Sequence, residues 1–469
     1  MMHRRIVLPL LACIVLPAQI AARQPADPDA RVDSVFARWN TAASPGCAVG
    51  VAHGDAPPFF RAYGMADLEH AVPNAPATIF EAGSVSKQFT AAAVVLLALD
   101  GQISLDDDIR KYIPEVPVYE WPVTIRHMLT HTSGLRDWGS VAGLSGWGRG
   151  ARVHTHDHVL DIVGRQSALN FRPGHEYSYS NTGYNLLAIL VDRVTGVPFA
   201  EFTRRRIFEP LGMADTQWRD DHTRIVARRA QAYGTRGATF VIDMPFENVH
   251  GNGGLLTTVG DLLVWNASLE SGKLGGARFL EMMHDVGVLN DGSKITYAAG
   301  LVVDTYRAWP EVSHTGATAG YRAFLARYPQ QDLSVALLCN VGNANPGALG
   351  HQVADVFLPA ATAVAEPPAS EESDAAQTSP FRPRPELLPE YAGTYHSDDA
   401  EATLTIEVVG EMLVARMRPA RRMPLRAVER DVFATPLGTF RFIRNAGGEV
   451  NELSVRQPRV YDMRYRRVR

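Results

Sequence analysis

The sequence predicts an α+β domain followed by a small antiparallel β domain. Strand-like segments lie at both ends of the first 360 residues, with helical patterns between them. This order does not favour a doubly wound sheet. It favours a sheet whose first and last strands become neighbours after a long helical insertion. Beyond residue 386 the chain changes to short alternating stretches separated by Gly, Asn or Pro turns. A length of 469 residues allows two or three domains.

The first residues have the pattern of an export signal. Basic residues precede an apolar stretch at 6–20, and Ala18, Ala21 and Ala22 offer small residues for cleavage. We therefore predict a signal peptide at 1–22, a periplasmic or secreted location, and no membrane span after its removal. Lipoprotein anchoring at Cys13 ranks second because the apolar run before this cysteine is short.

The elements of the first domain, at 30–360, follow from their periodicity. A β-like run predicts a strand at 46–52, and two more runs near the end of the domain, joined by a turn at 329–332, predict a hairpin. Glycines end two of the three helical patterns. The predicted helices cover 87–99, 184–194 and 259–269, and the predicted hairpin strands cover 322–328 and 333–339.

A stretch rich in Ala, Pro, Ser and Glu at 361–386 is typical of a linker. The strands expected at 387–469 fit either a barrel or a sandwich. From residue 402 onward the chain has 14 arginines, no lysine and 7 acidic residues, a net charge of +7. A soluble barrel from an arginine-preferring genome explains this charge better than attraction to an anionic envelope polymer.

The whole chain has a formal charge of −4, which gives no indication of nucleic-acid binding. Removal of the signal would leave two cysteines, Cys47 and Cys339, each in a β-like apolar stretch. An oxidising compartment permits a disulfide between them, but cysteines in apolar surroundings are more often buried free thiols. The sequence therefore favours free thiols.

One of the four lysines of the chain, Lys87, follows Ser84 by three residues at the start of an apolar run. If a helix begins at Ser84, the two side chains share one face. A desolvated lysine can lose its proton, as arginine cannot, and can then activate a serine nucleophile. The N-terminus of the helix also offers N–H groups to an oxyanion. Taken alone, however, this S-x-x-K tetrapeptide is more typical of a surface lysine.

Two further stretches favour catalysis. Tyr179-Ser180-Asn181 supplies a phenol that can relay protons and an amide that can bind both a lysine and a substrate carbonyl. His314-Thr315-Gly316 opens a predicted edge strand, where small residues let a substrate lie against the backbone. An N–H group of this strand can complete an oxyanion pair with that of Ser84.

These three motifs, in this order, resemble those of the penicillin-recognising serine hydrolases. The similarity is greatest to the branch of class C β-lactamases, D-alanyl-D-alanine carboxypeptidases, D-aminopeptidases and esterases. It extends to the flanking stretches TIRHMLTHTSGL, GNGGLLTTVGDLLVWN and GYRAFLARYPQQDLSVALLCN. The resemblance implies a β-lactamase/transpeptidase-like fold, with an antiparallel sheet, flanking helices and a helical subdomain. The stretch PEYAGTYH resembles the start of the lipocalin-like barrel appended to some D-aminopeptidase-type members.

The resemblance also implies roles for single residues. Ser84 would be the acylated nucleophile, Lys87 would take or share its proton, and Tyr179 would pass a proton to the leaving group. The backbone N–H groups of Ser84 and Ala317 would form the oxyanion hole. The implied substrate-binding residues are Asn181, His314, Thr315 and Gly316. No metal and no cofactor are implied.

The third motif departs from the β-lactamases, which have lysine where this chain has His314. Ordinary histidine is mostly neutral at neutral pH, so recognition of a substrate carboxylate at this site should be weaker. We therefore expect an exported serine hydrolase of D-aminopeptidase, D,D-carboxypeptidase or esterase type, acting on D-amino-acid-containing peptides or small esters and amides. A class C-type β-lactamase ranks second, and a non-catalytic protein that binds peptidoglycan fragments third. The expected partner is a small-molecule or peptide substrate, with peptidoglycan as a candidate and nucleic acid excluded.

Histidines elsewhere offer weaker signals. His127 and His131 are spaced i, i+4, and HTHDH holds three more histidines at 154–158. Both groups could suggest a metal, but the first belongs to a stretch in which the resemblance implies structural roles. The second has no matching distant ligands, so we predict no metal at either place.

Overall fold

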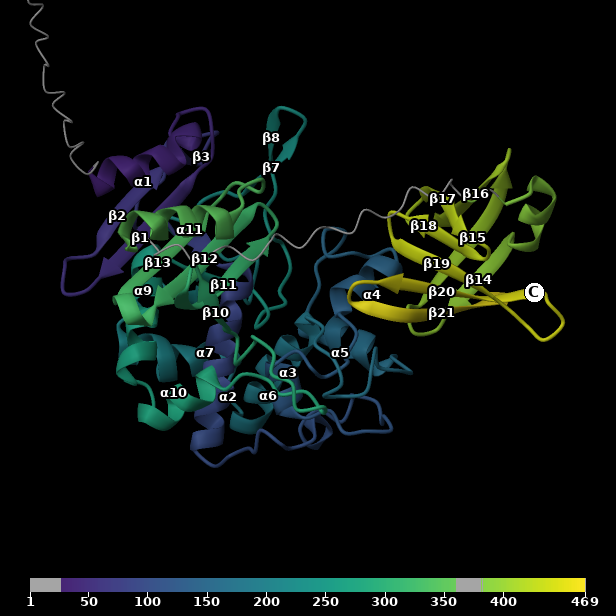
Figure 1. The fold of residues 1–469 in the computed structure, drawn as a ribbon, viewed down its shortest axis with the longest axis horizontal. Helices are drawn as coiled ribbons and strands as arrows, with labels where there is room; N and C mark the ends of the chain where they lie inside the picture. Colours follow the sequence, from purple (N-terminus) through teal and green to yellow (C-terminus); the bar gives the residue numbers. More distant parts are fainter. Residues whose placement is uncertain (1–26, 360–380, 382, 469) are drawn as a thin grey trace, which may run out of the picture.

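The computed structural model describes residues 27–359, 381 and 383–468. The predicted signal peptide at 1–22 and most of the predicted linker lie outside these residues. Figure 1 shows a mixed α/β region on the left and a β-barrel on the right, next to helices α4 (Trp138–Leu144) and α5 (His156–Gly164). None of the helices in the described part of the chain has both the length and the apolar character that a membrane span requires.

A six-stranded antiparallel sheet forms the centre of the first domain. Strands from the start and the end of the domain are neighbours in it, as predicted. In spatial order the strands are β10 (Val302–Tyr306), β11 (Trp309–Thr318), β12 (Tyr321–Tyr328), β13 (Leu333–Cys339), β1 (Cys47–His53) and β2 (Phe59–Tyr63).

Both faces of this sheet are covered, which explains the nearly continuous apolar sequence of β13. On one face, Val335 and Leu337 pack toward α1 (Pro28–Phe36) and α11 (Pro346–Phe357). On the other face, Leu338 belongs to the opposite core. Helix α9 (Val259–Ser271) contacts β13 and β1 from that opposite side.

Helix α2 (Lys87–Leu99) runs through the middle of the helical region, and all of its residues from 87 to 97 are buried. A helix that is apolar around its whole circumference is stable only where other elements cover it on all sides. It packs against α6 (Asn181–Thr195) and α10 (Gly276–His284). The other helices of this region are α3 (Ile125–Leu129), α7 (Phe199–Thr203) and α8 (Glu209–Leu211).

Short elements complete the first domain. The helical turns are η1 (Ala37–Trp39), η2 (Gly83–Ser86), η3 (Ile109–Lys111), η4 (Arg204–Phe208) and η5 (Pro329–Gln331). The small sheets contain β3 (Met65–Asp67) with β4 (Val72–Pro73), β5 (Phe80–Glu81) with β9 (Leu255–Thr257) and β6 (Gln217–Trp218), and β7 (Tyr233–Arg236) with β8 (Thr239–Ile242).

The predicted elements agree with the structure to within a few residues. The predicted helix at 87–99 is α2, and the predicted strand at 333–339 is β13. The condition set for pairing Ser84 with Lys87, a helix that begins at Ser84, is not met, because Ser84 lies in the 3₁₀ turn η2 and α2 begins at Lys87. The i, i+3 pairing survives this change because a 3₁₀ turn has three residues per turn and places i and i+3 in line.

The C-terminal strands form a closed antiparallel barrel of eight strands, which decides between the predicted barrel and sandwich. The short turn η6 (Pro385–Glu390) precedes it. The strands are β14 (Gly393–Ser397), β15 (Ala402–Val409), β16 (Met412–Met417), β17 (Arg421–Glu429), β18 (Val432–Thr435), β19 (Gly438–Arg444), β20 (Val450–Gln457) and β21 (Val460–Val468).

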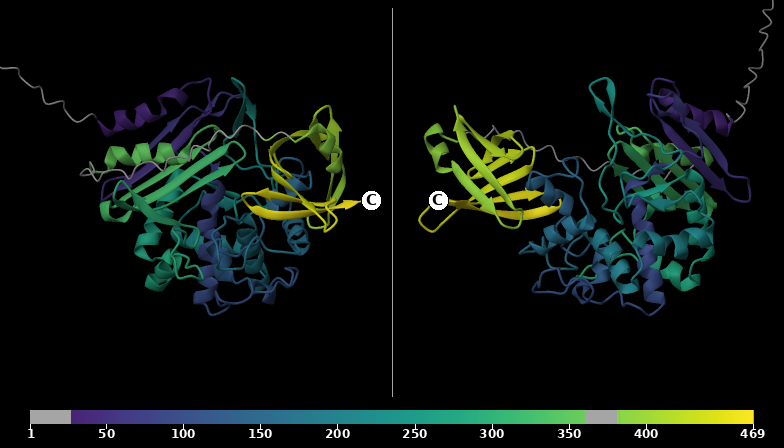
Figure 2. Two further views of the ribbon diagram at one scale, coloured as in Figure 1. Left: turned by 45° about the vertical axis from the view of Figure 1, so that its right-hand side comes forward. Right: turned by 180° about the vertical axis from the view of Figure 1, so that it is seen from behind.

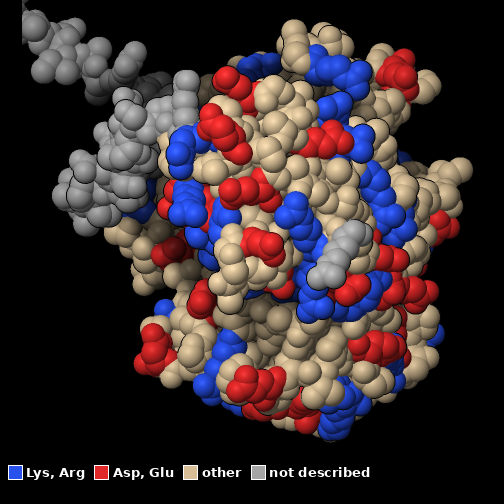
Figure 3. Space-filling view, turned by 90° about the vertical axis from the view of Figure 1, so that its right-hand side faces the viewer, with Lys and Arg blue, Asp and Glu red and all other residues tan. Residues whose placement is uncertain are grey.

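Figure 3 views the face that carries the barrel, where basic and acidic side chains are interspersed. Ion pairs such as Arg416–Glu407 and Arg464–Glu452 join neighbouring strands. These pairs favour the interpretation of an ordinary barrel surface over that of one continuous cationic surface.

The barrel contacts the helical region through hydrogen bonds and a buried ion pair, and Figure 2 shows the two side by side from further directions. The side chain of Arg136, which precedes α4, donates to the Asp399 carboxylate at 2.6 Å and to the Asp462 carbonyl oxygen at 2.7 Å. Arg418 of the barrel donates to the Ser145 carbonyl oxygen at 2.7 Å. Because the Arg136 side chain is only 3% exposed, the ion pair is held away from water.

The preference for free thiols is wrong. Cys47 and Cys339 form a disulfide with a sequence separation of 292 residues. The two cysteines are register partners on the neighbouring antiparallel strands β1 and β13. Their apolar flanks, which suggested buried thiols, are the inward-facing residues of these central strands.

Loss of this crosslink should destabilise the domain. The Cys47→Ala/Cys339→Ala variant is expected to lose about 2–4 kcal/mol in its free energy of unfolding, because the crosslink restricts the unfolded chain. Guanidinium denaturation with and without dithiothreitol measures this loss. The reductant should shift the wild type toward the variant and leave the variant unchanged. Full alkylation of both cysteines in denatured protein without reductant would contradict the disulfide.

Candidate active site

The turn that carries Ser84 packs directly against β11. Strand β10 pairs with one edge of β11 only as far as Ser313, so beyond this residue that edge of β11 faces the turn η2, while its other edge stays paired with β12. Gly83 has a φ of +52°, and a Cβ atom there would lie 2.6 Å from the Ala317 nitrogen. A Cβ atom on Gly316 would lie 2.0 Å from the Ala82 carbonyl oxygen. The two glycines therefore allow the close approach that brings the backbones of Ser84 and Ala317 together.

The Lys87 amine is fully buried, and each of its close partners is an oxygen atom. Its Nζ lies 2.9 Å from Asn181 Oδ1, 2.7 Å from the Asn252 carbonyl oxygen and 3.3 Å from Ser84 Oγ. Burial holds the pKa of Lys87 well below its ordinary value, and Asp137 opposes this shift. A neutral amine has two N–H groups and one lone pair. The two carbonyl oxygens accept the N–H groups, which leaves the lone pair for the Ser84 hydroxyl.

Tyr179 lies beside this pair. The Lys87 Nζ is 4.8 Å from the centre of the Tyr179 ring, and the buried Tyr179 hydroxyl has no hydrogen-bond partner among the described residues. Burial raises the pKa of Tyr179, and the nearby Ser84 hydroxyl and Arg459 partly offset this rise. The phenol is therefore protonated at neutral pH and keeps its hydroxyl available to a reactant.

The third motif carries no positive charge at neutral pH. His314 is 5% exposed, and burial lowers its pKa to about 4. Its Nδ1 donates to the Thr315 carbonyl oxygen, so its Nε2 accepts from the Tyr297 hydroxyl at 2.9 Å. This arrangement agrees with the neutral histidine expected from the sequence. Gly316, predicted to contact substrate, also has the packing role against residue 82 described above.

A cavity of about 530 Å³ opens in front of these groups. Its lining includes the predicted residues Ser84, Tyr179, Asn181, His314, Thr315, Gly316 and Ala317. Thus the structure brings together the predicted residues, with Lys87 immediately behind Ser84. Asn252 and Gly253, from one of the flanking stretches that carry the family resemblance, also line it.

Several neighbours of the site were missed from the sequence. Asp137 accepts from the Asn181 backbone N–H at 2.8 Å and thereby fixes the start of α6. Arg149, Arg322 and Arg459 line the cavity, and Arg459 comes from the barrel. An aspartate and scattered arginines carry no motif signal, so nothing in the sequence pattern identified them.

The histidines considered as metal ligands have structural partners. The side chains of His127 and His158 accept from the backbone N–H groups of Thr124 and Thr155 at helix starts. His131 accepts from the Ser180 N–H at 3.2 Å and so helps to place the second motif. Within the described ranges, a group with metal-ligand spacing occurs at Asp67, Glu69 and His70, which do not line the cavity.

Three tryptophans of the first domain lie outside the cavity. Trp138 and Trp218 are 0% and 1% exposed, and neither they nor Trp147 line the cavity. Trp138 and Trp218 therefore contribute to the core, and the ring of Trp147 lies 5.6 Å from the guanidinium carbon of Arg418 in the barrel.

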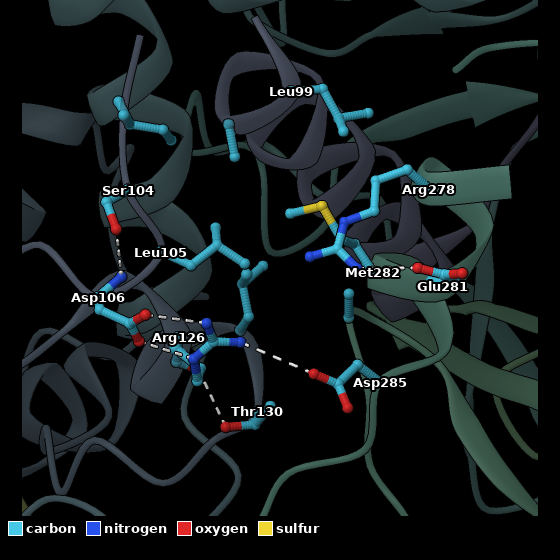
Figure 4. A pocket seen from close by; sticks show the side chains of 14 residues that line it. Leu99, Ser104, Leu105, Asp106, Arg126, Thr130, Arg278, Glu281, Met282 and Asp285 are labelled. Atoms are coloured by element: carbon cyan, nitrogen blue, oxygen red, sulfur yellow. Dashed lines mark hydrogen bonds and ion pairs between the residues drawn. The ribbon is translucent and has the colours of Figure 1, made fainter. Parts of the chain in front are cut away.

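A larger cavity, shown in Figure 4, lies beside the C-terminal half of α2 and α10. Arg126 projects between Asp106 and Asp285, and Arg278 pairs with Glu281. Because its cations and anions already pair with one another, and the three motifs lie elsewhere, this cavity does not explain the chemistry of Ser84.

Comparison with known proteins places the chain in a family. The Beta-lactamase family model matches residues 32–356. Penicillin-binding protein 4* of Bacillus subtilis (strain 168) is 28% identical over 302 residues, which cover 60% of this chain and 65% of that protein. The D-aminopeptidase of Brucella anthropi is 27% identical over 299 residues, covering 63% and 56%. The chain spans less than two thirds of the length of these relatives.

Solved structures share the fold. The octameric penicillin-binding protein homologue from Pyrococcus abyssi has a TM-score of 0.62 at 21% identity and covers 93% of this chain and 98% of its own. The D-amino acid amidase from Ochrobactrum anthropi SV3 has a TM-score of 0.60 at 22% identity, covering 71% and 98%. With a family model that matches residues 32–356, this chain belongs to the Beta-lactamase family, a family of serine hydrolases.

Proposed function

We propose that this protein is an exported serine hydrolase that forms an acyl-enzyme on Ser84 and acts on D-amino-acid-containing peptides or small esters and amides. The observation that carries the proposal is the position of the buried Lys87 amine, whose Nζ lies 3.3 Å from Ser84 Oγ and within hydrogen-bond distance of two carbonyl oxygens. In its neutral form this amine donates its two N–H groups to the carbonyl oxygens and keeps a lone pair for the Ser84 hydroxyl proton. A cation in bulk water could not act in this way.

Acylation follows from these positions. The Ser84 oxygen attacks the substrate carbonyl carbon while Lys87 takes the hydroxyl proton. The backbone N–H groups of Ser84 and Ala317, brought close by Gly83 and Gly316, stabilise the resulting oxyanion. Tyr179 donates its proton to the leaving group, which departs as the amine or alcohol. The proton on Lys87 then restores the phenol.

Hydrolysis of the acyl-enzyme reverses these proton transfers. A water molecule enters the space that the leaving group vacates, and the Lys87–Tyr179 pair takes its proton while the water oxygen attacks the acyl carbonyl carbon. Collapse of this adduct breaks the ester bond to Ser84 Oγ. The Ser84 oxygen regains a proton as the acid product leaves. Asn181 serves both steps, because its Oδ1 holds Lys87 and the residue also lines the cavity.

The disulfide supports the export part of the proposal, because disulfides persist in oxidising compartments. The D-amino-acid part draws on the relatives named D-aminopeptidase and on the amidase of the same fold. Turnover of D-alanyl anilides, short esters and nitrocefin by the purified protein tests the substrate class. Preference for nitrocefin would favour the β-lactamase alternative, and absence of any acyl-enzyme would favour the non-catalytic one.

Tyr179→Phe tests the proton donor. The acylation rate with a D-alanyl anilide is expected to fall about 10²–10⁴-fold. Acylation by a p-nitrophenyl ester should fall much less, because nitrophenolate leaves without a proton. Stability should change little, since the Tyr179 hydroxyl has no partner among the described residues to lose. Tyr177→Phe, at a side chain that is 41% exposed, is the matched control. Equal losses with both substrates in single-turnover measurements would contradict this role.

A further inference from the structure

Three arginines line the cavity in front of Ser84. Its lining includes Arg149, Arg322 and Arg459 and, among the described residues, no aspartate or glutamate. The positive charge comes chiefly from these arginines and not from the three motifs, because burial lowers the pKa of His314 to about 4 and holds the pKa of Lys87 well below its ordinary value. A cavity with this balance favours an anionic group on its ligand.

The three arginines differ in how far the protein already uses them. Arg149 forms a two-point ion pair with Glu247, one bond of which measures 2.9 Å. Arg322 donates to the backbone carbonyl oxygens of Ala319 and Tyr321, each at 2.7 Å. The hydrogen-bonding capacity of these two guanidinium groups is therefore partly occupied.

Of the three guanidinium groups, that of Arg459 is the most available to bind a ligand. Its nearest carboxylate oxygen belongs to Asp137 and lies 4.0 Å away. That carboxylate already accepts N–H groups from Ser140 at 3.0 Å and Asn181 at 2.8 Å. In the described part of the chain, no hydrogen bond from the Arg459 side chain is found, and 41% of that side chain is exposed. Its donors are free to bind a ligand.

The barrel nevertheless holds Arg459 in a defined place. Its carbonyl oxygen, in the turn between β20 and β21, accepts from Asn170 Nδ2 at 3.0 Å and from the Asp137 N–H at 3.3 Å. Asn170 Oδ1 in turn accepts from the Tyr461 N–H at 2.9 Å. The buried pair of Arg136 and Asp399 fixes the barrel nearby. Such support keeps a binding group in position.

The position of Arg459 indicates which side of the substrate it meets. Its guanidinium carbon lies 4.8 Å from the centre of the Tyr179 ring. Tyr179 is the proposed proton donor to the leaving group, so Arg459 stands on the leaving-group side of Ser84.

We propose that Arg459 binds a carboxylate carried by the leaving group, so that the C-terminal barrel supplies the cation that the third motif lacks. The inference rests on the proposed function and names its substrate class: acyl compounds that release an amino acid, hydroxy acid or mercapto acid with a free carboxylate. It reverses the expectation, drawn from His314 alone, that substrates without a carboxylate would be favoured.

A matched pair of thioesters tests this proposal. N-acetyl-D-alanyl thioesters of mercaptoacetate and of mercaptoacetamide differ in the charge of the leaving group. Because the two thiols also differ in intrinsic reactivity, the readout is the change in the ratio of their kcat/KM values between wild type and Arg459→Gln. We expect that ratio to fall about 10–100-fold, the range for a charged hydrogen-bond pair. Arg459→Lys should restore part of it, and Arg426→Gln, at an exposed barrel residue outside the cavity lining, should leave it unchanged.

A binding measurement separates this inference from the proposed function. Calorimetry on Ser84→Ala protein compares N-acetyl-D-alanyl-D-alanine with its C-terminal amide, and needs no turnover. Tighter binding of the acid, lost in Ser84→Ala/Arg459→Gln, supports the inference even if no acyl-enzyme forms. Equal binding of acid and amide by the Ser84→Ala protein, or a thioester ratio that Arg459→Gln leaves unchanged, would overturn it. Failure of Ser84 to become acylated in wild type would instead overturn the proposed function.

Discussion

Replacement of Ser84 by alanine is expected to lower kcat by about 10⁴–10⁶-fold, the loss typical of removing a serine nucleophile. The fold should survive, because the hydrogen bond that the Ser84 side chain forms with Lys87 is replaceable: the amine keeps its acceptors on Asn181 and Asn252. Intact-mass spectrometry after treatment with a fluorophosphonate should show one adduct on wild type and none on Ser84→Ala. Turnover of the best substrate from the ester and anilide panel gives the rate.

A neighbouring serine provides the control. Ser86 lies in the same turn, but its hydroxyl donates to the Gly83 carbonyl oxygen and accepts from the Leu255 N–H at 3.1 Å. Ser86→Ala should therefore lose stability, by about 1–3 kcal/mol for the buried groups left unpaired, and still carry the adduct on Ser84. If the adduct formed on another residue, or if Ser84→Ala kept the wild-type rate, Ser84 would not be the nucleophile.

Short stretches of sequence were enough to predict much of the fold and the central residues of the site. The buried helix α2 and the strand β13 are long, apolar and bounded by turn residues, so their positions follow from periodicity. The motifs at Ser84, Tyr179 and His314 were recognised because each combines several functional residues within a few positions. The structure places residues of all three motifs around one cavity, while their catalytic roles stay predictions until tested.

The features of the fold and of the site that could not be predicted depend on contacts between segments that are distant in the sequence. Nothing near Arg459 in the sequence distinguishes it from the other arginines of the barrel, and only the docking of the β20–β21 turn beside Asp137 brings it to Tyr179. The disulfide required the register of β1 against β13, which apolar flanks do not specify. The 3₁₀ turn before α2 was not foreseen, because such a turn brings residues i and i+3 to one side much as a helix does.

Replacement of Lys87 should abolish most activity while Ser84 remains present. Lys87→Met removes the proton acceptor and keeps the space filled, and Lys87→Arg supplies donors that cannot lose a proton. Both are expected to lower kcat about 10²–10⁴-fold, the usual contribution of a general base. Lys111→Arg is the matched control, because the Lys111 side chain is 59% exposed and pairs with Asp107 at 3.0 Å. It should keep the wild-type rate.

The pH dependence distinguishes a proton acceptor from a structural lysine. Lys87 acts only when neutral, so the wild-type rate should rise with pH through its pKa, and burial places this rise well below the ordinary value of 10.5. Lys87→Met should lack this rise. The free energy of unfolding should also rise with pH. Between the lowered pKa of Lys87 in the folded protein and its ordinary pKa in the unfolded chain, only the unfolded chain binds the proton, so wild-type stability increases with pH across that window.

A Lys87 variant that loses rate but keeps the wild-type pH profile would show that Lys87 only supports the fold. The proton acceptor would then have to be sought elsewhere, since the Tyr179 phenol, with its raised pKa, is protonated at neutral pH.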